Sequence, residues 1–228
     1  MCLNNWGGID HKVLEFHEYV NLFSGKSGSG KSTVMDAIQV ILYGSFSPSF
    51  LNKAADDAKN RRSVLSYLRG EQKDGSANRK DCDFCSVIAL EIEDTGTHII
   101  TCIGIAFEVR KSDSEIKKFV YFSHSGKMPE SEYLTEQGVC YSNQEIKKLV
   151  SARTKSDDNR GKGEVNRIYG SKEAYLGTLY DVILGYIDQN RFITMEKSAI
   201  ALKMTNGTGQ FIRDYMFPKN TSNTIATI

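Results

Sequence analysis

The eight residues from Gly25 to Ser32, Gly-Lys-Ser-Gly-Ser-Gly-Lys-Ser, constrain this chain more than any other segment, because they follow the P-loop pattern G-x-x-x-x-G-K-[ST]. A phosphate chain needs several converging N–H donors, and glycines let the backbone wrap closely around it. We expect Lys31 to reach the β- and γ-phosphates and the Ser32 hydroxyl to ligate Mg²⁺. The predicted phosphate-binding residues are Gly25, Ser27, Gly28, Ser29, Gly30, Lys31, Ser32 and Thr33.

The residues on either side of this loop predict a strand–loop–helix unit over residues 10–44. Lys12–Phe16 and Tyr19–Phe23 are expected to pair as a hairpin whose second strand leads into the loop. Apolar residues recur at helical spacing from Thr33 to Tyr43, and Gly44 follows where a helix end often needs a left-handed residue. The alternative is a flexible Gly/Ser-rich loop that binds nothing.

The composition gives the chain no overall charge that would attract nucleic acid or a membrane surface. The net charge of +1 results from 29 basic and 28 acidic residues, so any contact with nucleic acid must be local. No window approaches the run of about 20 apolar residues that spans a membrane, and the N-terminus does not resemble a signal peptide. The five cysteines form no disulfide framework. We therefore expect a cytoplasmic protein without a membrane partner.

The cysteines at positions 82 and 85 have the spacing of a metal or redox pair. No second pair of Cys or His residues follows nearby to complete a zinc site. Two unrelated thiols at the start of a strand are therefore the interpretation that we prefer, and the metal or redox pair is the alternative.

The middle of the chain predicts an antiparallel β-meander over residues 84–122. Its strands, rich in Val, Ile, Phe and Tyr, are expected at Phe84–Glu93, His98–Arg110 and Glu115–Phe122. Before it lies a basic segment, residues 50–70, in which a short helix should end at Gly70. Its basic residues suit either a solvated face or contacts to phosphate. Residues 71–80 are polar and should form a mobile surface loop.

The remaining part, residues 142–217, is predicted to be largely helical. Ser142 and Glu145 form a capping box, and Ser171 should cap a second helix. A short strand is expected at Val165–Tyr169 between them. A last helix should include Gln210–Phe217, before Pro218.

The chain lacks several parts of a complete P-loop ATPase. Such an enzyme needs an acidic residue at the end of an apolar strand and a group that positions the attacking water. The nearest candidate, Val182–Asp188, contains glycine and lies at a predicted helix end, so we do not accept it. There is also no signature segment of the Leu-Ser-Gly-Gly type and no guanine-reading Asn-Lys-x-Asp motif. The chain therefore has the content of half an ATPase.

Several segments resemble the N-terminal half of the ATPase head of MukB-like SMC proteins, above all the SMC-type subunits of Wadjet plasmid-defence complexes. These segments are Asn5-Trp6, Leu22–Gln39, Phe50–Ala55, Arg62–Gly70, Tyr169–Tyr175 and Phe211–Pro218. The resemblance implies an α/β fold, a P-loop NTPase of the ABC/SMC head type. Residues 1–228 would form its N-terminal lobe only, as a single unit.

In that family the missing half lies beyond a coiled coil and carries the signature motif, the Walker B strand and the catalytic Glu. The resemblance therefore implies that this chain holds no catalytic residue of its own. By the same resemblance it would bind ATP and Mg, and its partners would be the C-terminal half of the same head, a second head, kleisin-type and nuclease subunits, and double-stranded DNA.

The same resemblance assigns further residues. Arg62 would contact nucleotide or DNA, and His11 and Lys12 would lie on the adenine side. Ser27 stands where the usual SMC loop has Asn, a change that a backbone cradle tolerates. Gln189 is a candidate for the glutamine that senses the γ-phosphate, although its surroundings do not match the family pattern.

Two other classes of function stay open. The chain could be a self-contained nucleotide-binding regulatory module without turnover, or a complete small P-loop kinase. The absence of an acidic strand end disfavours the kinase.

Overall fold

In the computed structural model, the chain divides into two units, Met1–Tyr186 and Ile187–Ile228. The structure describes residues 1–26, 28–48, 51, 63–72, 74–156 and 165–200, without the side chains of 156 and 197–200. The predicted helix at Gln210–Phe217 lies outside the described residues, as does most of the basic segment.

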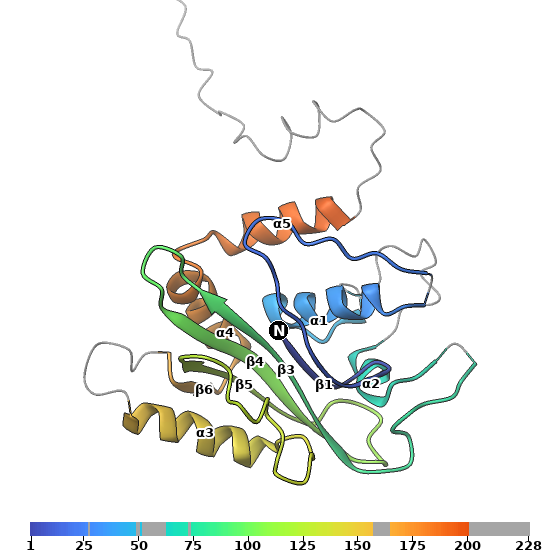
Figure 1. The fold of residues 1–228 in the computed structure, drawn as a ribbon. Coiled ribbons are helices and arrows are strands. Elements are labelled where there is room, and N and C mark those ends of the chain that lie inside the picture. The colour runs from blue at the N-terminus through green and yellow to red at the C-terminus, as the bar shows by residue number, and fades with distance from the viewer. Residues whose placement is uncertain (27, 49–50, 52–62, 73, 157–164, 201–228) are drawn as a thin grey trace, which may run out of the picture. The chain divides into compact units, whose positions relative to one another are not determined.

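The first unit is built on a sheet of six strands in the order β2-β1-β3-β4-β5-β6, in which all neighbours are antiparallel (Figure 1). The strands are β1 (Cys2–Trp6), β2 (Ile9–Val13), β3 (Phe84–Glu93), β4 (Ile100–Val109), β5 (Lys118–Ser125) and β6 (Arg167–Tyr169). The predicted meander is confirmed as β3 to β5, and the predicted short strand as β6. An α/β fold is also confirmed, because helices cover both faces of this sheet.

One face of the sheet packs against α3 (Asn143–Ser156). Phe122 of β5 is fully buried there with Ile146 and Val150 of the helix and with Tyr133 from the preceding segment. The predicted capping box opens this helix, since Ser142 donates its N–H to the Glu145 carboxylate at 2.7 Å. Because side chains alternate along a strand, Tyr121 points to the opposite face.

That opposite face carries α1 (Lys31–Tyr43), α4 (Lys172–Gly177) and a π-helical turn, Thr178–Ile183 (Figure 1). The α1 helix ends at Gly44 in the left-handed conformation, with φ of 53°, as predicted. Three tyrosine hydroxyls donate hydrogen bonds to carbonyl oxygens at this end. The pairs are Tyr121 to Gly44 at 2.6 Å, Tyr175 to Ile41 at 3.0 Å and Tyr180 to Leu42 at 3.0 Å. They satisfy carbonyls that a helix end leaves unpaired.

The predicted hairpin before the P-loop is wrong. The hairpin lies earlier, from β1 to β2, and the Tyr19–Phe23 segment is not a strand in the described structure. The position of the core explains the difference. Cys2 and Leu3 of β1 are fully buried, so β1 is the strand that the core stabilises. The strand-forming side chains of Tyr19–Phe23 have no such neighbours, and residues 15–26 are all exposed.

The α2 helix (Val64–Arg69) confirms the predicted short helix that ends at Gly70, and Ser63 caps its first turn. The loop that follows, residues 71–80, lies mostly at the surface as predicted, but one of its side chains is buried and anchors it. Arg79 is buried, with only 7% of its surface exposed, and donates to the Leu68 carbonyl at 2.9 Å and to Asp10 at 2.8 Å. A single arginine therefore ties this loop to α2 and to β2.

The described part of the second unit is α5 (Gln189–Ile200). The Asp188 carboxylate accepts a hydrogen bond from the Arg191 N–H at 2.8 Å, which caps the first turn. Across the residues that the structure describes, no helix combines the length and the apolar character needed to cross a membrane.

Candidate phosphate-binding site

The P-loop backbone adopts conformations that require glycine. Gly25, Gly28 and Gly30 have φ angles of 153°, 83° and 89°, which side-chain-bearing residues rarely adopt. A Cβ atom on Gly25 would also lie 2.7 Å from the Ser29 hydroxyl oxygen. The loop is thus closed tightly on itself, as a backbone cradle for phosphate requires. Ser27 lies outside the described residues.

The first turn of α1 is suited to an anion. Gly30 precedes the helix, and no side chain accepts a hydrogen bond at this cap. There is also no acidic residue in the first turn. The N–H groups and the positive end of the helix dipole therefore face no competing negative charge, which favours binding of a phosphate group.

The Lys31 ammonium lies over the loop, as the motif predicts. It donates to the carbonyl oxygens of Gly25 at 2.6 Å and Lys26 at 2.9 Å, and to the Ser29 hydroxyl at 3.2 Å. These three oxygens hold the positive charge beside the backbone that would receive the phosphates. Ser32 is exposed and Thr33 half-buried in the first helical turn. The structure thus brings the described P-loop residues together in one place.

His11 is not brought to this site. The His11 ring lies between two acceptors, the Asn4 side-chain oxygen and the Glu132 carboxylate, each at 2.6 Å. Asn4 belongs to the face of the sheet that α3 covers, because it alternates with Cys2, a member of that core. Lys12 is exposed on the edge strand β2. Arg62, the other residue assigned by resemblance, lies outside the described residues.

The cysteine pair is split between two environments. Cys82 is exposed, whereas Cys85 is half-buried on β3, and burial raises the pKa of the Cys85 thiol to about 11. A thiol with a raised pKa is a poor metal ligand or nucleophile, because the thiolate is the reactive form. Within the described residues, no group of three or more His, Cys, Asp or Glu side chains is placed to hold a metal ion.

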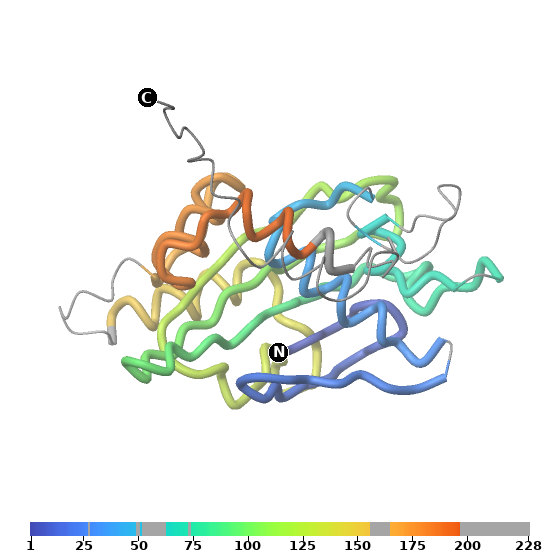
Figure 2. The backbone as a smooth tube through the Cα atoms, turned by 90° about the horizontal axis from the view of Figure 1, so that it is seen from above, coloured from blue at the N-terminus to red at the C-terminus, as the bar shows by residue number. Residues whose placement is uncertain are grey.

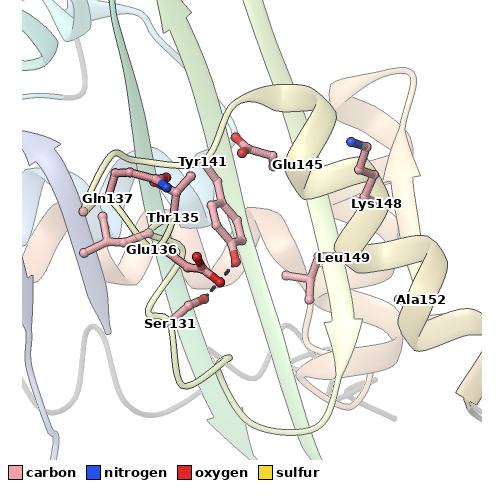
Figure 3. A pocket seen from close by; sticks show the side chains of 11 residues that line it. Ser131, Thr135, Glu136, Gln137, Tyr141, Glu145, Lys148, Leu149 and Ala152 are labelled. Carbon is pink, nitrogen blue, oxygen red and sulfur yellow. Dashed lines mark hydrogen bonds between the residues drawn. The ribbon is translucent and has the colours of Figure 1, made fainter.

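A groove of about 960 Å³ opens beside α3, on the face of the sheet away from α1 (Figure 3). Tyr141 and Leu149 form part of its wall, and the Tyr141 hydroxyl lies 3.0 Å from that of Ser131. Glu145 and Lys148 also line it, so its charge is mixed. It is separate from the P-loop and has no concentration of phosphate-binding groups.

The structure shows one feature near the P-loop that the sequence prediction missed. The approach segment, residues 14–24, runs along the outside of the unit before the chain reverses at the P-loop (Figure 2). Tyr19, Val20 and Leu22 are 87%, 77% and 89% exposed. The residue types of Tyr19–Phe23 indicate a strand, but in the described structure the segment pairs with no strand of the sheet, and no signal in the sequence reveals this.

Comparison with known proteins supports nucleotide binding at this site. Residues 1–58 match a family model described as the P-loop containing region of AAA domain. The match includes the P-loop and α1, so the chain contains a P-loop of the nucleotide-binding type. A search among curated proteins found no match.

Proposed function

We propose that this chain is the ATP-binding N-terminal half of an SMC-like ATPase head. With a C-terminal half and a second head, it would couple ATP hydrolysis to DNA handling in plasmid defence. The P-loop geometry and the family match support nucleotide binding. The choice of an SMC-like head rests on the resemblance of Asn5-Trp6, Phe50–Ala55 and Arg62–Gly70 to that family.

The observation that carries the proposal is the exposed approach segment. Val20 and Leu22 belong in a sheet by their residue types, yet they are almost fully exposed immediately before the phosphate-binding loop. A segment of this kind can pair with the edge of a strand from another part of a protein, which would bury its apolar side chains. A C-terminal half that supplied this neighbour would bury the apolar side chains and bring its own acidic strand end close to Lys31 and Ser32.

The residues present fit Mg-ATP. Gly25 to Gly30 and the first turn of α1 would bind the phosphates through backbone N–H groups, Lys31 would contribute a positive charge, and Ser32 would ligate Mg²⁺. When bound, Mg²⁺ neutralises charge on the phosphate oxygens. The sequence offers no acceptable acidic residue at the end of an apolar strand to serve such a site. Hydrolysis would therefore depend on the C-terminal half.

The wider assembly follows from the same proposal. Binding of ATP between two heads would favour the closed pair, because a nucleotide shifts an equilibrium toward the state that it contacts more. The kleisin-type and nuclease subunits and double-stranded DNA are further proposed partners. Arg62 is the proposed contact to nucleotide or DNA, and the proposed location is the cytoplasm.

The test separates binding from turnover. The purified chain should bind Mg-ATP in calorimetry with negligible hydrolysis, and addition of the C-terminal head segment should produce turnover that Lys31→Ala abolishes. Turnover by the isolated chain would contradict the half-head proposal. If the chain binds ATP but no C-terminal segment produces turnover, the alternative of a self-contained regulatory module is favoured.

A further inference from the structure

The N-terminal end of α1 is held by residues that lie far from the P-loop in the sequence. The Trp6 indole N–H donates to the Thr33 carbonyl, in the first turn of α1, at 2.8 Å. Trp6 is fully buried and stacks on Tyr67 of α2, with ring centroids 5.0 Å apart and planes 8° from parallel. The Tyr67 hydroxyl donates to the buried Asp36 carboxylate one turn further along α1.

A local break in β1 places Trp6 on this face. Asn5 has a φ of 56°, and its side-chain amide donates to the Cys85 carbonyl at 2.8 Å, which stabilises that conformation. The strand alternation is interrupted there, so Trp6 faces α1 instead of the face that it would otherwise share with Cys2 and Asn4. The next residue, Gly7, has a φ of 58°, and a Cβ atom on it would lie 2.6 Å from the Thr33 methyl carbon. The turn between β1 and β2 therefore presses directly on α1.

Arg79 joins these contacts into one body. Its guanidinium donates to the carbonyl oxygens of Gly7 and Leu68, one in the β1–β2 turn and the other in α2. The Gly7 N–H in turn donates to the Tyr67 carbonyl at 2.8 Å. The turn and α2 thus contact each other, and together they hold the first two turns of α1.

We propose that Trp6, Gly7 and Tyr67 form a positioning bracket that sets the affinity of the P-loop for Mg-ATP. The bracket contacts the carbonyl oxygen of Thr33, which follows the predicted Mg²⁺ ligand Ser32 and is itself a predicted phosphate-binding residue. Its three residues hold the helix N–H groups and the Ser32 hydroxyl in the geometry that the phosphates need, because a displaced ligand loses much of its contribution. This inference rests on the proposed function, since it concerns the same nucleotide site.

The two ends of α1 provide a matched control. Tyr67→Phe and Tyr180→Phe each remove one hydroxyl that is hydrogen-bonded to α1, the first at its N-terminal part and the second at the Leu42 carbonyl near its C-terminus. Both variants keep the aromatic ring, and Tyr67→Phe should lower thermal stability more, because the Tyr67 hydroxyl is bonded to a buried carboxylate and the Tyr180 hydroxyl to a carbonyl oxygen. A purely structural role predicts that neither variant changes nucleotide binding. The bracket predicts that only Tyr67→Phe weakens Mg-ATP binding, by about fivefold, as expected for one lost hydrogen bond.

The experiment measures Mg-ATP affinity by calorimetry and the exchange of amide hydrogens at residues 30–34 by mass spectrometry. Tyr67→Phe and Trp6→Phe should weaken affinity and accelerate exchange, whereas Tyr180→Phe should leave both within about twofold of the wild type. If Trp6→Phe does not fold, the Tyr67→Phe comparison decides alone. Equal affinities and equal exchange for Tyr67→Phe and the wild type would overturn the bracket.

Failure of the proposed function would give a different result. If the wild-type chain binds no Mg-ATP, nucleotide binding is contradicted, and the bracket is then judged from amide exchange alone. Faster exchange at residues 30–34 in Tyr67→Phe than in Tyr180→Phe would still support it, and identical exchange would overturn it. Because Trp6 is the single tryptophan of the chain, its fluorescence reports on this contact without a label.

Discussion

The meander β3–β5 and the approach segment before the P-loop have similar strand-forming sequences but opposite environments. Each meander strand lies beside another strand of the same chain, as in the pairing of Ile105 with Ile88 and with Tyr121. The approach segment has exposed apolar side chains, among them Leu22 at 89% exposure. The comparison teaches that strand-forming residues specify a strand only where a neighbouring strand is supplied. Among the described residues, the meander has such neighbours and the segment that leads into the site does not.

The largest expected effect lies in the meander. Phe122→Ala removes a fully buried ring between β5 and α3, so it should lower the free energy of unfolding by about 3–5 kcal/mol through lost burial and a residual cavity. Urea denaturation followed by circular dichroism measures it. A loss below about 1 kcal/mol would show that the sheet core is not the stabilising part of the unit.

The next largest effect should be a loss of nucleotide affinity at the P-loop that leaves the fold unchanged. Lys31→Ala removes the ammonium that lies over the loop, so Mg-ATP affinity should fall about 10- to 100-fold, the range of hydrogen bonds to charged groups. The midpoint of thermal unfolding should hardly change, because Lys31 donates only to loop oxygens near the surface. Lys26→Ala serves as the control, since its exposed side chain neighbours the same loop. Equal affinities for Lys31→Ala and the wild type would contradict the assigned role of Lys31.

A pH-dependent contribution to stability should arise from a buried histidine of the sheet. His124 is fully buried, with one ring nitrogen 3.0 Å from the Ser125 carbonyl and the other 2.9 Å from the Tyr133 hydroxyl. Burial lowers the pKa of His124 below its ordinary value of 6.5. The unfolded chain then binds a proton that the folded chain does not, so stability is lost as the pH falls below about 6.5.

Denaturant unfolding of the wild type and of His124→Gln at pH 7.5 and pH 5 measures the contribution of His124 to the pH dependence of stability. The wild type should lose more stability over that interval than the variant, whose amide does not titrate. Parallel losses in the two proteins would show that His124 does not contribute.

The smallest effect on stability is expected in the approach segment. Leu22→Asp should change the free energy of unfolding of the isolated chain by no more than about 0.5 kcal/mol, because the side chain is exposed. The same variant should weaken assembly with the C-terminal head segment, measured by size-exclusion chromatography with light scattering. Val139→Asp, at a position 59% exposed on the other face of the sheet, is the control and should assemble normally. Normal assembly by Leu22→Asp would contradict completion of the strand by that segment.

The sequence predicted correctly the features that depend on neighbouring residues, and it missed features that depend on contacts between distant residues. Gly44, Gly70, Ser171 and the Ser142–Glu145 capping box marked helix ends correctly, because caps depend on neighbouring residues. The polar segment around Arg79 was misjudged, since its burial depends on carbonyl oxygens of Gly7 and Leu68 that are distant in sequence. The role of Trp6 at α1 was hidden for the same reason.

By itself, the sequence determined the chemistry of the candidate site. The spacing of Gly25, Gly30, Lys31 and Ser32 requires a phosphate-binding loop before a helix, because glycine conformations and helix N–H groups are local properties. Only the tertiary structure decided that β1 pairs with β2 and β3, which face His11 occupies and how α1 is held at both ends. Those outcomes depend on contacts between residues that are distant in the sequence. The approach segment is exposed because, among the described residues, no strand pairs with it.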